Sequence, residues 1–314
     1  MTAPEPTGGV EVWRGGVNTW ECDEMGHMNV RFYVQRVQEG LAGLALRLGM
    51  PHAFASDAHS TLRLRRHHIR FLAEATAGAP LHMQGGVVEM GESTADLVFV
   101  LMHGDGRPCA SFRTRVQHAT RDGRAFPWPQ RARDAALSLA WEPPAVALPR
   151  SVTTADAFHA DASLERADAL KLTCIARGVV EPAACDAFSR MNPSEFIGRV
   201  SDGIGVLLAG VRRTVQDAAG ERPERMGGAV LEYRLDYLRE PRLGDHLEVR
   251  SGISEITERY QRMAHWSLDP VSGKPWAVSE AVAINFELDR RKVVPIAQAA
   301  RDALAHRVTP GLLG

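Results

Sequence analysis

The sequence is poor in features that mark several classes of protein. It has only four cysteines, none in a Cys-x-x-Cys spacing and none next to paired histidines: Cys22, Cys109, Cys174 and Cys185. This argues against a zinc site or a disulfide framework and suits a reducing cytosol. The 37 Lys and Arg residues almost balance the 38 Asp and Glu residues, for a formal net charge of −1. Nothing in that balance indicates a polyanion such as nucleic acid as a partner.

Long hydrophobic runs are missing as well. The apolar stretch ADLVFVLMHGDG is interrupted and well below the ~20 residues of a membrane-spanning helix. The amino-terminal stretch MTAPEPTGGVEVW lacks the basic and apolar segments of a secretory signal. We therefore expect a cytoplasmic protein with no membrane partner.

The chain contains an internal repeat. Its 314 residues exceed one ordinary domain, because single cores stop growing near roughly 250–300 residues. Residues 14–40 align without a gap to residues 177–203, and 10 of the 27 positions are identical, where random pairing would give about two. The identical pairs are Arg14/Arg177, Gly15/Gly178, Val17/Val180, Cys22/Cys185, Asp23/Asp186, Met28/Met191, Asn29/Asn192, Arg36/Arg199, Val37/Val200 and Gly40/Gly203.

Each copy of this repeat predicts one long helix. The apolar residues after Asn29 recur at the spacing of a one-sided helical stripe, as do those after Asn192. Asparagine is a good N-cap, and Pro193 suits the first helical position. The two stripes correspond position for position: Tyr33, Val37, Leu41, Leu44 and Leu48 in the first copy, and Phe196, Val200, Ile204, Leu207 and Val211 in the second.

Antiparallel strands are expected after each helix. Residues 95–103 and 260–268 each precede a Gly/Pro/Asp turn and another β-rich run, which is a hairpin signal. We predict an α+β fold with two units at residues 1–121 and 166–300, a linker at 122–165 and a tail at 301–314. Short helices are expected at residues 131–139 and 297–306.

The most informative stretch lies directly before the first helix. There Asp23 precedes Gly26 and His27 by a few residues, so a carboxylate, a permissive backbone and a helix amino terminus come together. Free N–H groups and the positive end of the helix dipole can hold a developing oxyanion. A carboxylate in the adjacent loop can activate water or attack directly. This arrangement makes the stretch a candidate acyl-transfer site.

The pattern Asp23-x-x-Gly26-His27-Met28-Asn29, followed by an aromatic-rich helix, resembles the hotdog-fold acyl-CoA thioesterases of the 4-hydroxybenzoyl-CoA thioesterase group. Members carry Asp-x-x-Gly-His-Val-Asn before a long central helix that the sheet wraps. The resemblance covers most of residues 10–120 and, more weakly, 170–290. It implies two tandem hotdog units, packed as an intramolecular pseudo-dimer with sites between them.

The resemblance also implies roles for individual residues. Asp23 would be the general base or the nucleophile, and N–H groups near Gly26 and Met28 would polarise the thioester carbonyl. His27 would orient substrate or water, and Asn29 would cap the helix. The implied partner is a small-molecule acyl-CoA, with no metal and no cofactor. Whether pairs of units associate further into a homo-oligomer stays open.

The second copy departs from this pattern. Asp186 and Asn192 persist, but Ser189 and Arg190 replace Gly26 and His27. We expect the Asp23 site to carry catalysis and the second site to be degenerate or specialised. In it, Arg190 would pair with Asp186 or with an anionic substrate group, the structural Asp–Arg pair being favoured.

Other candidates carry weaker signals. Arg65 and Arg66 lie in a basic run suited to the phosphates of coenzyme A, although a solvated strand face is the default interpretation. Glu39 is a reserve candidate, since some related thioesterases use a helix carboxylate. Tyr33 and Phe196 are expected in the core.

Two other functions remain open. One is hydration or dehydration of an enoyl or hydroxyacyl thioester, because Met191-Asn192-Pro193 partly matches the pattern Gly-Asp-x-Asn-Pro-x-His of such hotdog enzymes. The other is non-catalytic binding of an acyl thioester. Plant-type acyl-carrier-protein thioesterases resemble this chain in having two units, but their intact site is in the second one. Acyl length, aromatic or aliphatic acyl type, and the choice between coenzyme A and acyl carrier protein are left undetermined.

Overall fold

The computed structural model describes residues 8–154, 161–218, 226–287, 290 and 292–313. By its contacts the chain divides into two compact units, residues 1–149 with 183–198 and residues 150–182 with 199–314. The domain boundaries predicted at residues 121, 165 and 300 were drawn from the sequence repeat and not from contacts, and they stay a prediction. Within the described residues, no helix is long and apolar enough to cross a membrane.

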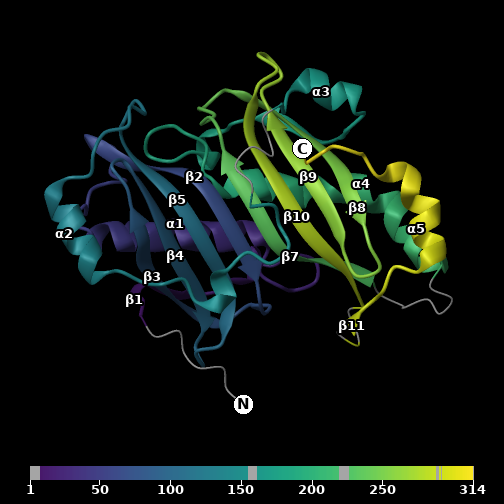
Figure 1. Cartoon of the computed structure of the whole chain (residues 1–314), viewed down its shortest axis with the longest axis horizontal. Helices are drawn as coiled ribbons and strands as arrows, with labels where there is room; N and C mark the ends of the chain where they lie inside the picture. The colour runs from purple at the N-terminus through teal and green to yellow at the C-terminus, as the bar shows by residue number, and fades with distance from the viewer. Residues whose placement is uncertain (1–7, 155–160, 219–225, 288–289, 291, 314) are drawn as a thin grey trace. The chain divides into compact units, whose positions relative to one another are not determined.

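The first copy of the repeat is an antiparallel sheet with one long helix (Figure 1). Strand β1 and the short turn η1 precede helix α1, and four strands follow it. The elements are β1 (Val10–Gly16), η1 (Thr19–Glu21), α1 (Val30–Arg47), β2 (Ser60–Phe71), β3 (Pro80–Met90), β4 (Thr94–His103) and β5 (Pro108–Thr120). The strands lie in the order β1-β3-β4-β5-β2, each antiparallel to its neighbour.

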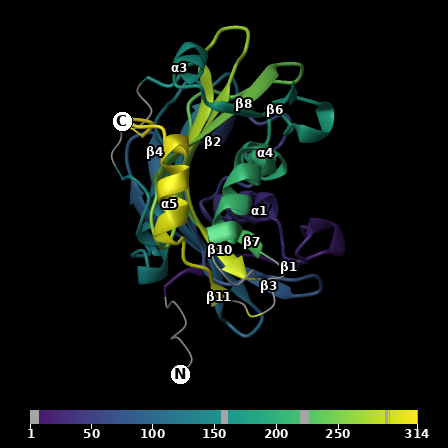
Figure 2. The ribbon, with the colours of Figure 1, turned by 90° about the vertical axis from the view of Figure 1, so that its right-hand side faces the viewer.

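The second copy repeats this order. Its elements are β6 (Thr173–Val179), η3 (Pro182–Ala184), α4 (Ser194–Ala218), β7 (Met226–Tyr237), β8 (His246–Ile256), β9 (Gln261–Leu268), β10 (Pro275–Glu287) and β11 (Lys292–Val293). Strands β6-β8-β9-β10-β7 are again antiparallel, and β11 pairs antiparallel with the last two residues of β10. The predicted α+β fold of two tandem units, each a sheet with a long helix, is confirmed; Figure 2 views the long helices nearly end-on.

The core of the first unit lies between α1 and its sheet. The predicted stripe of α1 is buried throughout, from Tyr33 to Leu48. Tyr33 meets Phe71 of β2 edge to face, with ring centroids 5.2 Å apart. A Cβ on Gly43 would stand 2.0 Å from the Val12 carbonyl oxygen, so this glycine allows α1 to lie directly against β1.

The segment after β5 is a packed part of the first unit. Its helix α2 (Gln130–Ser138) matches the short helix predicted there, and the turn η2 (Ala145–Ala147) follows. Trp141 and Ala147 form a buried cluster with Val98, Val100 and Met102 of β4. Because side chains alternate along a strand, this cluster covers the sheet face opposite α1. The expected surface connector therefore supplies core residues.

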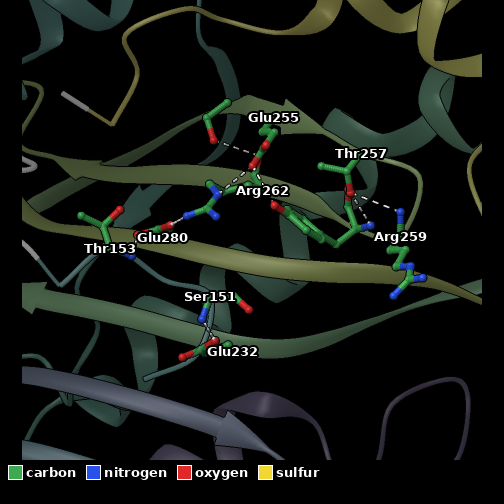
Figure 3. A network of polar contacts seen from close by, with 10 residues as sticks. Ser151, Thr153, Glu232, Glu255, Thr257, Arg259, Arg262 and Glu280 are labelled. Atoms are coloured by element: carbon green, nitrogen blue, oxygen red, sulfur yellow. Dashed lines mark hydrogen bonds and ion pairs between the residues drawn. The ribbon is translucent and has the colours of Figure 1, made fainter. Parts of the chain in front are cut away.

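The connector continues across the sheet of the second unit. Glu232 of β7 accepts hydrogen bonds from the N–H groups of Arg150 and Ser151, at 2.8 and 2.6 Å. Glu280 of β10 accepts one from the Thr153 N–H at 2.7 Å. Both carboxylates are buried, and Arg262 compensates the charge of Glu280 (Figure 3). Buried carboxylates are stable only when they are paired in this way.

Two further helices complete the second unit, α3 (Leu164–Ala169) and α5 (Gln298–Leu304), with the turn η4 (Ala305–Arg307). Helix α5 lies within residues 297–306, where a short helix is predicted. One face of the sheet packs against residues that precede and follow its strands. Trp266 and Val278 of the sheet contact Leu164, Ala167 and Leu312.

Candidate active site

Asp23 lies in a tight loop between η1 and α1. Its Oδ1 accepts hydrogen bonds from the N–H groups of Met25, at 2.9 Å, and His27, at 3.1 Å. The Asp23 N–H donates to the His27 carbonyl at 2.8 Å. Among the described residues none donates to Oδ2. One carboxylate oxygen therefore fixes the loop, and the other is available to a water molecule or a substrate.

The N–H groups expected to form the oxyanion hole are already engaged, by the loop itself or by the segment after β2. The Gly26 N–H donates to the Asp23 carbonyl at 3.0 Å, and the Met28 N–H donates to the Ala75 carbonyl at 2.8 Å. The His27 N–H is held by Asp23 Oδ1. In this geometry the residues from Gly26 to Met28 shape the loop, and they offer no free N–H to a substrate oxygen. Gly26 has a φ of +80°, as its predicted permissive role requires.

The amino terminus of α1 offers a different donor. Asn29 is the N-cap, as predicted: its side chain accepts from the Arg31 N–H at 3.0 Å, and its carbonyl accepts from the Phe32 N–H at 2.9 Å. The Val30 N–H, at the first helical position, has no hydrogen-bond partner in the described part of the chain. It stands at the positive end of the helix dipole, where an anionic oxygen is stabilised.

Glu74, which the reasoning from sequence missed, is the acidic neighbour of His27. Its Oε2 lies 3.4 Å from His27 Nε2, and the His27 side chain is 12% exposed. A β-bridge between His27 and Thr76, and the hydrogen bond from Met28 to Ala75, hold the loop against this segment. The sequence carried one faint signal, a glutamate at the corresponding place in the second copy, Glu240.

Tyr33 is a core residue, as predicted, and it lies near Asp23 and Glu74. It is 4% exposed. Burial raises the pKa of its hydroxyl well above the ordinary value, and Cys109, Glu74 and Asp23 nearby raise that pKa further. Tyr33 therefore stays protonated at neutral pH and cannot serve as a base.

The reserve candidate Glu39 lies in an ionic cluster farther along α1. Its Oε1 is 2.8 Å from Arg36 Nη1, and its other oxygen accepts a hydrogen bond from Trp13. The buried Arg36 also binds Glu21 in η1. Glu39 is the ninth residue after Val30, about 13 Å farther along the helix axis. The structure therefore places Glu39 away from the amino terminus of α1.

The second copy builds the same loop. Asp186 Oδ1 accepts from the N–H groups of Phe188, at 2.8 Å, and Arg190, at 3.0 Å, and the Asp186 N–H donates to the Arg190 carbonyl at 2.7 Å. Ser189 adopts the left-handed conformation of Gly26, with a φ of 58°. Loss of the glycine therefore does not change the loop, although the serine bears backbone strain.

The chemistry of the second loop differs. The guanidinium of Arg190 donates to Asp186 Oδ2 through Nε at 2.9 Å and lies 2.8 Å away through Nη2. It also stacks over Phe188 and is 5% exposed. Asn192 keeps its loop contact, donating to the Ala184 carbonyl at 2.8 Å, but Pro193 stands where Val30 stands in the first copy, and proline has no N–H. The predicted Asp–Arg pair is present, and it occupies the oxygen that is available on Asp23.

Arg65 and Arg66 lie on β2. Arg65 donates to the side-chain oxygen of Gln117 on β5 at 3.1 Å. Strand alternation from Phe71 places Arg66 on the sheet face opposite α1. The described residues contain no group of three or more His, Cys, Asp or Glu side chains that could hold a metal ion.

Three solved structures resemble the chain over almost their whole length. They are a putative oleoyl thioesterase from Lactobacillus plantarum (TM-score 0.65, 10% identity, 89% of this chain and 98% of that one), an acyl-ACP thioesterase from Bacteroides thetaiotaomicron (0.60, 12%, 86% and 96%) and the 12:0-ACP thioesterase from Umbellularia californica (0.59, 14%, 86% and 92%). At these identities the likeness establishes the fold alone, and that fold is the double hotdog.

A comparison with curated protein sequences found no match. The model of the thioesterase-like superfamily, by contrast, matches the two copies separately, at residues 17–136 and 180–304. Both matched segments contain one of the Asp loops and one long helix, and membership supports thioester hydrolysis in general. With both halves of the repeat matched and the double-hotdog fold in place, the chain belongs to the thioesterase-like superfamily.

Proposed function

We propose that the protein hydrolyses an acyl-CoA or aryl-CoA thioester to the free acid and coenzyme A, with Asp23 as the catalytic carboxylate. The observation that carries the proposal is the difference between the two loops. They share one hydrogen-bonding pattern, yet only the first leaves a carboxylate oxygen and a helix N–H without partners in the described chain. Those two groups are what acyl transfer requires.

The Val30 N–H would donate a hydrogen bond to the carbonyl oxygen as negative charge develops on that oxygen. As water or Asp23 attacks, the carbonyl π bond breaks and the oxygen becomes an oxyanion. The first-turn N–H and the helix dipole stabilise it. This assignment moves the oxyanion hole from Gly26 and Met28, whose N–H groups hold the loop, to the first residue of α1.

Asp23 could act in two ways. As a general base, it removes a proton from water while the water oxygen attacks the carbonyl carbon, and collapse of the tetrahedral intermediate expels the thiolate of coenzyme A. As a nucleophile, it forms a mixed anhydride with release of that thiolate, and water then cleaves the anhydride. A single turnover in ¹⁸O-labelled water separates these routes, because only the nucleophilic one can leave label in the Asp23 carboxylate.

His27 would orient substrate or water beside Asp23. Its main chain is fixed by the loop, and its ring lies next to the Glu74 carboxylate. A fixed imidazole at this place can donate a hydrogen bond or pass a proton to the leaving thiolate. The site as proposed needs no metal and no cofactor.

A panel of acyl-CoA, aryl-CoA and acyl-carrier-protein thioesters, followed with a thiol reagent, tests the function. Carrier-protein substrates belong in it because two of the similar structures are described as acyl-ACP thioesterases. We expect thiol release from at least one acyl-CoA, and a loss of about 10²-fold or more in kcat for Asp23→Asn and Asp23→Ala.

Two variants serve as controls. Asp186→Asn should retain activity because Asp186 is held by Arg190, and Glu39→Gln should retain it because Glu39 is held by Arg36. A fully active Asp23→Asn would refute the mechanism. If no thioester in the panel released thiol, the binding-protein and hydratase alternatives would move ahead, and spectrophotometry with an enoyl-CoA would test the latter.

A further inference from the structure

Trp20 projects into solvent from the turn that precedes the Asp23 loop. Its side chain is 77% exposed, whereas the other five tryptophans are buried or half-buried. Within the described residues its indole has no hydrogen bond and no ring contact. A large aromatic surface left in water is unusual for a tryptophan and is typical of a contact with a partner or ligand.

The turn that carries Trp20 is rigidly held. The buried Glu21 accepts a hydrogen bond from the Asn18 N–H at 2.9 Å and forms an ion pair with Arg36. Its carbonyl accepts from the Asn29 N–H at 2.8 Å, which joins the turn to the start of α1. The backbone that carries the indole is therefore fixed relative to the Asp23 loop, which preorganises the place from which the side chain projects.

The repeat provides an internal comparison. Turn η3 in the second copy has the same length and place as η1, and Ala183 occupies the position of Trp20. The turn does not need an aromatic residue to form, because the second copy forms it with alanine. The tryptophan is present in the copy whose carboxylate is free and absent in the copy whose carboxylate is paired with Arg190.

We propose that Trp20 binds the pantetheine arm of the thioester substrate as the arm approaches Asp23, an inference that rests on the proposed function. Asp23 is the third residue after Trp20, so their Cα atoms lie at most about 10 Å apart. The adenine nucleotide of coenzyme A lies beyond the whole pantetheine arm, while the methyl and amide groups of that arm lie close to the thioester. An indole offers an apolar face to the methyl groups and one N–H donor.

Truncated substrates test the proposal. For Trp20→Ala, KM for an acyl-CoA and for the matching acyl-pantetheine should rise about tenfold with kcat nearly unchanged. KM for the matching S-acyl-N-acetylcysteamine, which lacks the pantoyl group, should not change. Trp20→Phe should lie close to the wild type. Equal effects on all three substrates, or no effect on any, would overturn the proposal.

An acyl-carrier-protein substrate tests whether Trp20 contacts the pantetheine arm, which both kinds of substrate share, or the carrier protein itself. A matching rise in KM for acyl-ACP and acyl-pantetheine supports contact with the shared arm. An effect on acyl-ACP alone would mean that Trp20 contacts the carrier protein, and the proposal would fall. Leu137→Ala, which removes another exposed apolar side chain, from α2, is the matched control and should leave every KM unchanged.

Binding without turnover separates this proposal from the proposed function. The indole N–H signal of Trp20, assigned by its loss in Trp20→Phe, should shift in NMR spectra on addition of coenzyme A or pantetheine. A shift in a protein that hydrolyses no thioester would refute the hydrolase function and leave the Trp20 contact standing. Active enzyme whose Trp20 signal does not respond to either ligand would refute the contact.

Discussion

The guanidinium of Arg190 lies against the carboxylate of Asp186, with Nε and Nη2 at 2.9 and 2.8 Å from Oδ2. In the first copy the residue at that position is His27, whose ring lies beside Glu74, and Asp23 Oδ2 has no donor in the described chain. The two loops otherwise share their backbone hydrogen bonds and a left-handed fourth residue. One substitution thus separates an available carboxylate from a neutralised one.

Replacing Val30 by proline tests the proposed oxyanion donor. Proline removes the N–H, yet it suits the first position of a helix, and Asn29 before it has the extended conformation that proline favours (ψ 144°). The second copy already has Pro193 there. We expect Val30→Pro to fold like the wild type and to lose about 10²–10³ in kcat with little change in KM. Circular dichroism and steady-state kinetics check this. Full activity would remove Val30 from the mechanism.

Removal of Asp186 should reduce stability and leave activity intact. Arg190 is 5% exposed, so Asp186→Ala would leave a buried guanidinium without its carboxylate, at a cost of about 3 kcal/mol in the free energy of unfolding. Urea denaturation measures this. The double variant Asp186→Ala/Arg190→Met removes both charges and should recover most of the loss. If the single variant instead abolished hydrolysis, the second loop would be a catalytic site.

His265 should make stability depend on pH. Its ring is fully buried beside Ser251, with Nδ1 2.8 Å from the hydroxyl, and burial lowers its pKa to about 3. The unfolded chain takes up a proton near pH 6.5 and the folded chain does not, so stability present at pH 7.5 is lost as the pH falls from about 6.5 toward 3. Between pH 7.5 and 5 this group accounts for about 2 kcal/mol.

The variant His265→Gln should therefore lose less stability than the wild type between pH 7.5 and pH 5, as urea denaturation at the two values would show. His59 is exposed, and His59→Gln serves as the control. Identical pH dependence in His265→Gln and wild type would contradict the assignment.

The connector should detach from the second unit when its two carboxylate anchors are removed. Glu232 and Glu280 together accept three backbone N–H groups of residues 150–153. In Glu232→Ala/Glu280→Ala these groups lose their acceptors, so trypsin should cut after the exposed Arg150 at least tenfold faster. Glu232→Gln/Glu280→Gln keeps an acceptor oxygen at each place and should be cut more slowly than the alanine variant. Fragment masses identify the cleavage, and equal rates for all three proteins would show that the anchors are dispensable.

The sequence by itself determined the repeat, both long helices and the hairpins, because apolar period and turn residues are local signals that survive without tertiary context. It also determined the Asp loop, since Asp23, Gly26 and Asn29 act on neighbours within a few residues. Even the pairing of Arg190 with Asp186 was accessible, because the two residues are four apart in one loop.

Only the tertiary structure decided which polar groups remain available. The N–H of Met28 is engaged by Ala75, and His27 has Glu74 as its neighbour, contacts between segments almost fifty residues apart. The same holds for the connector. Trp141 packs on β4 and the Ser151 N–H donates to Glu232, and the composition of the connector reveals neither contact. A hydrogen-bond donor is free or engaged according to what the whole fold brings to it, and no local pattern encodes that.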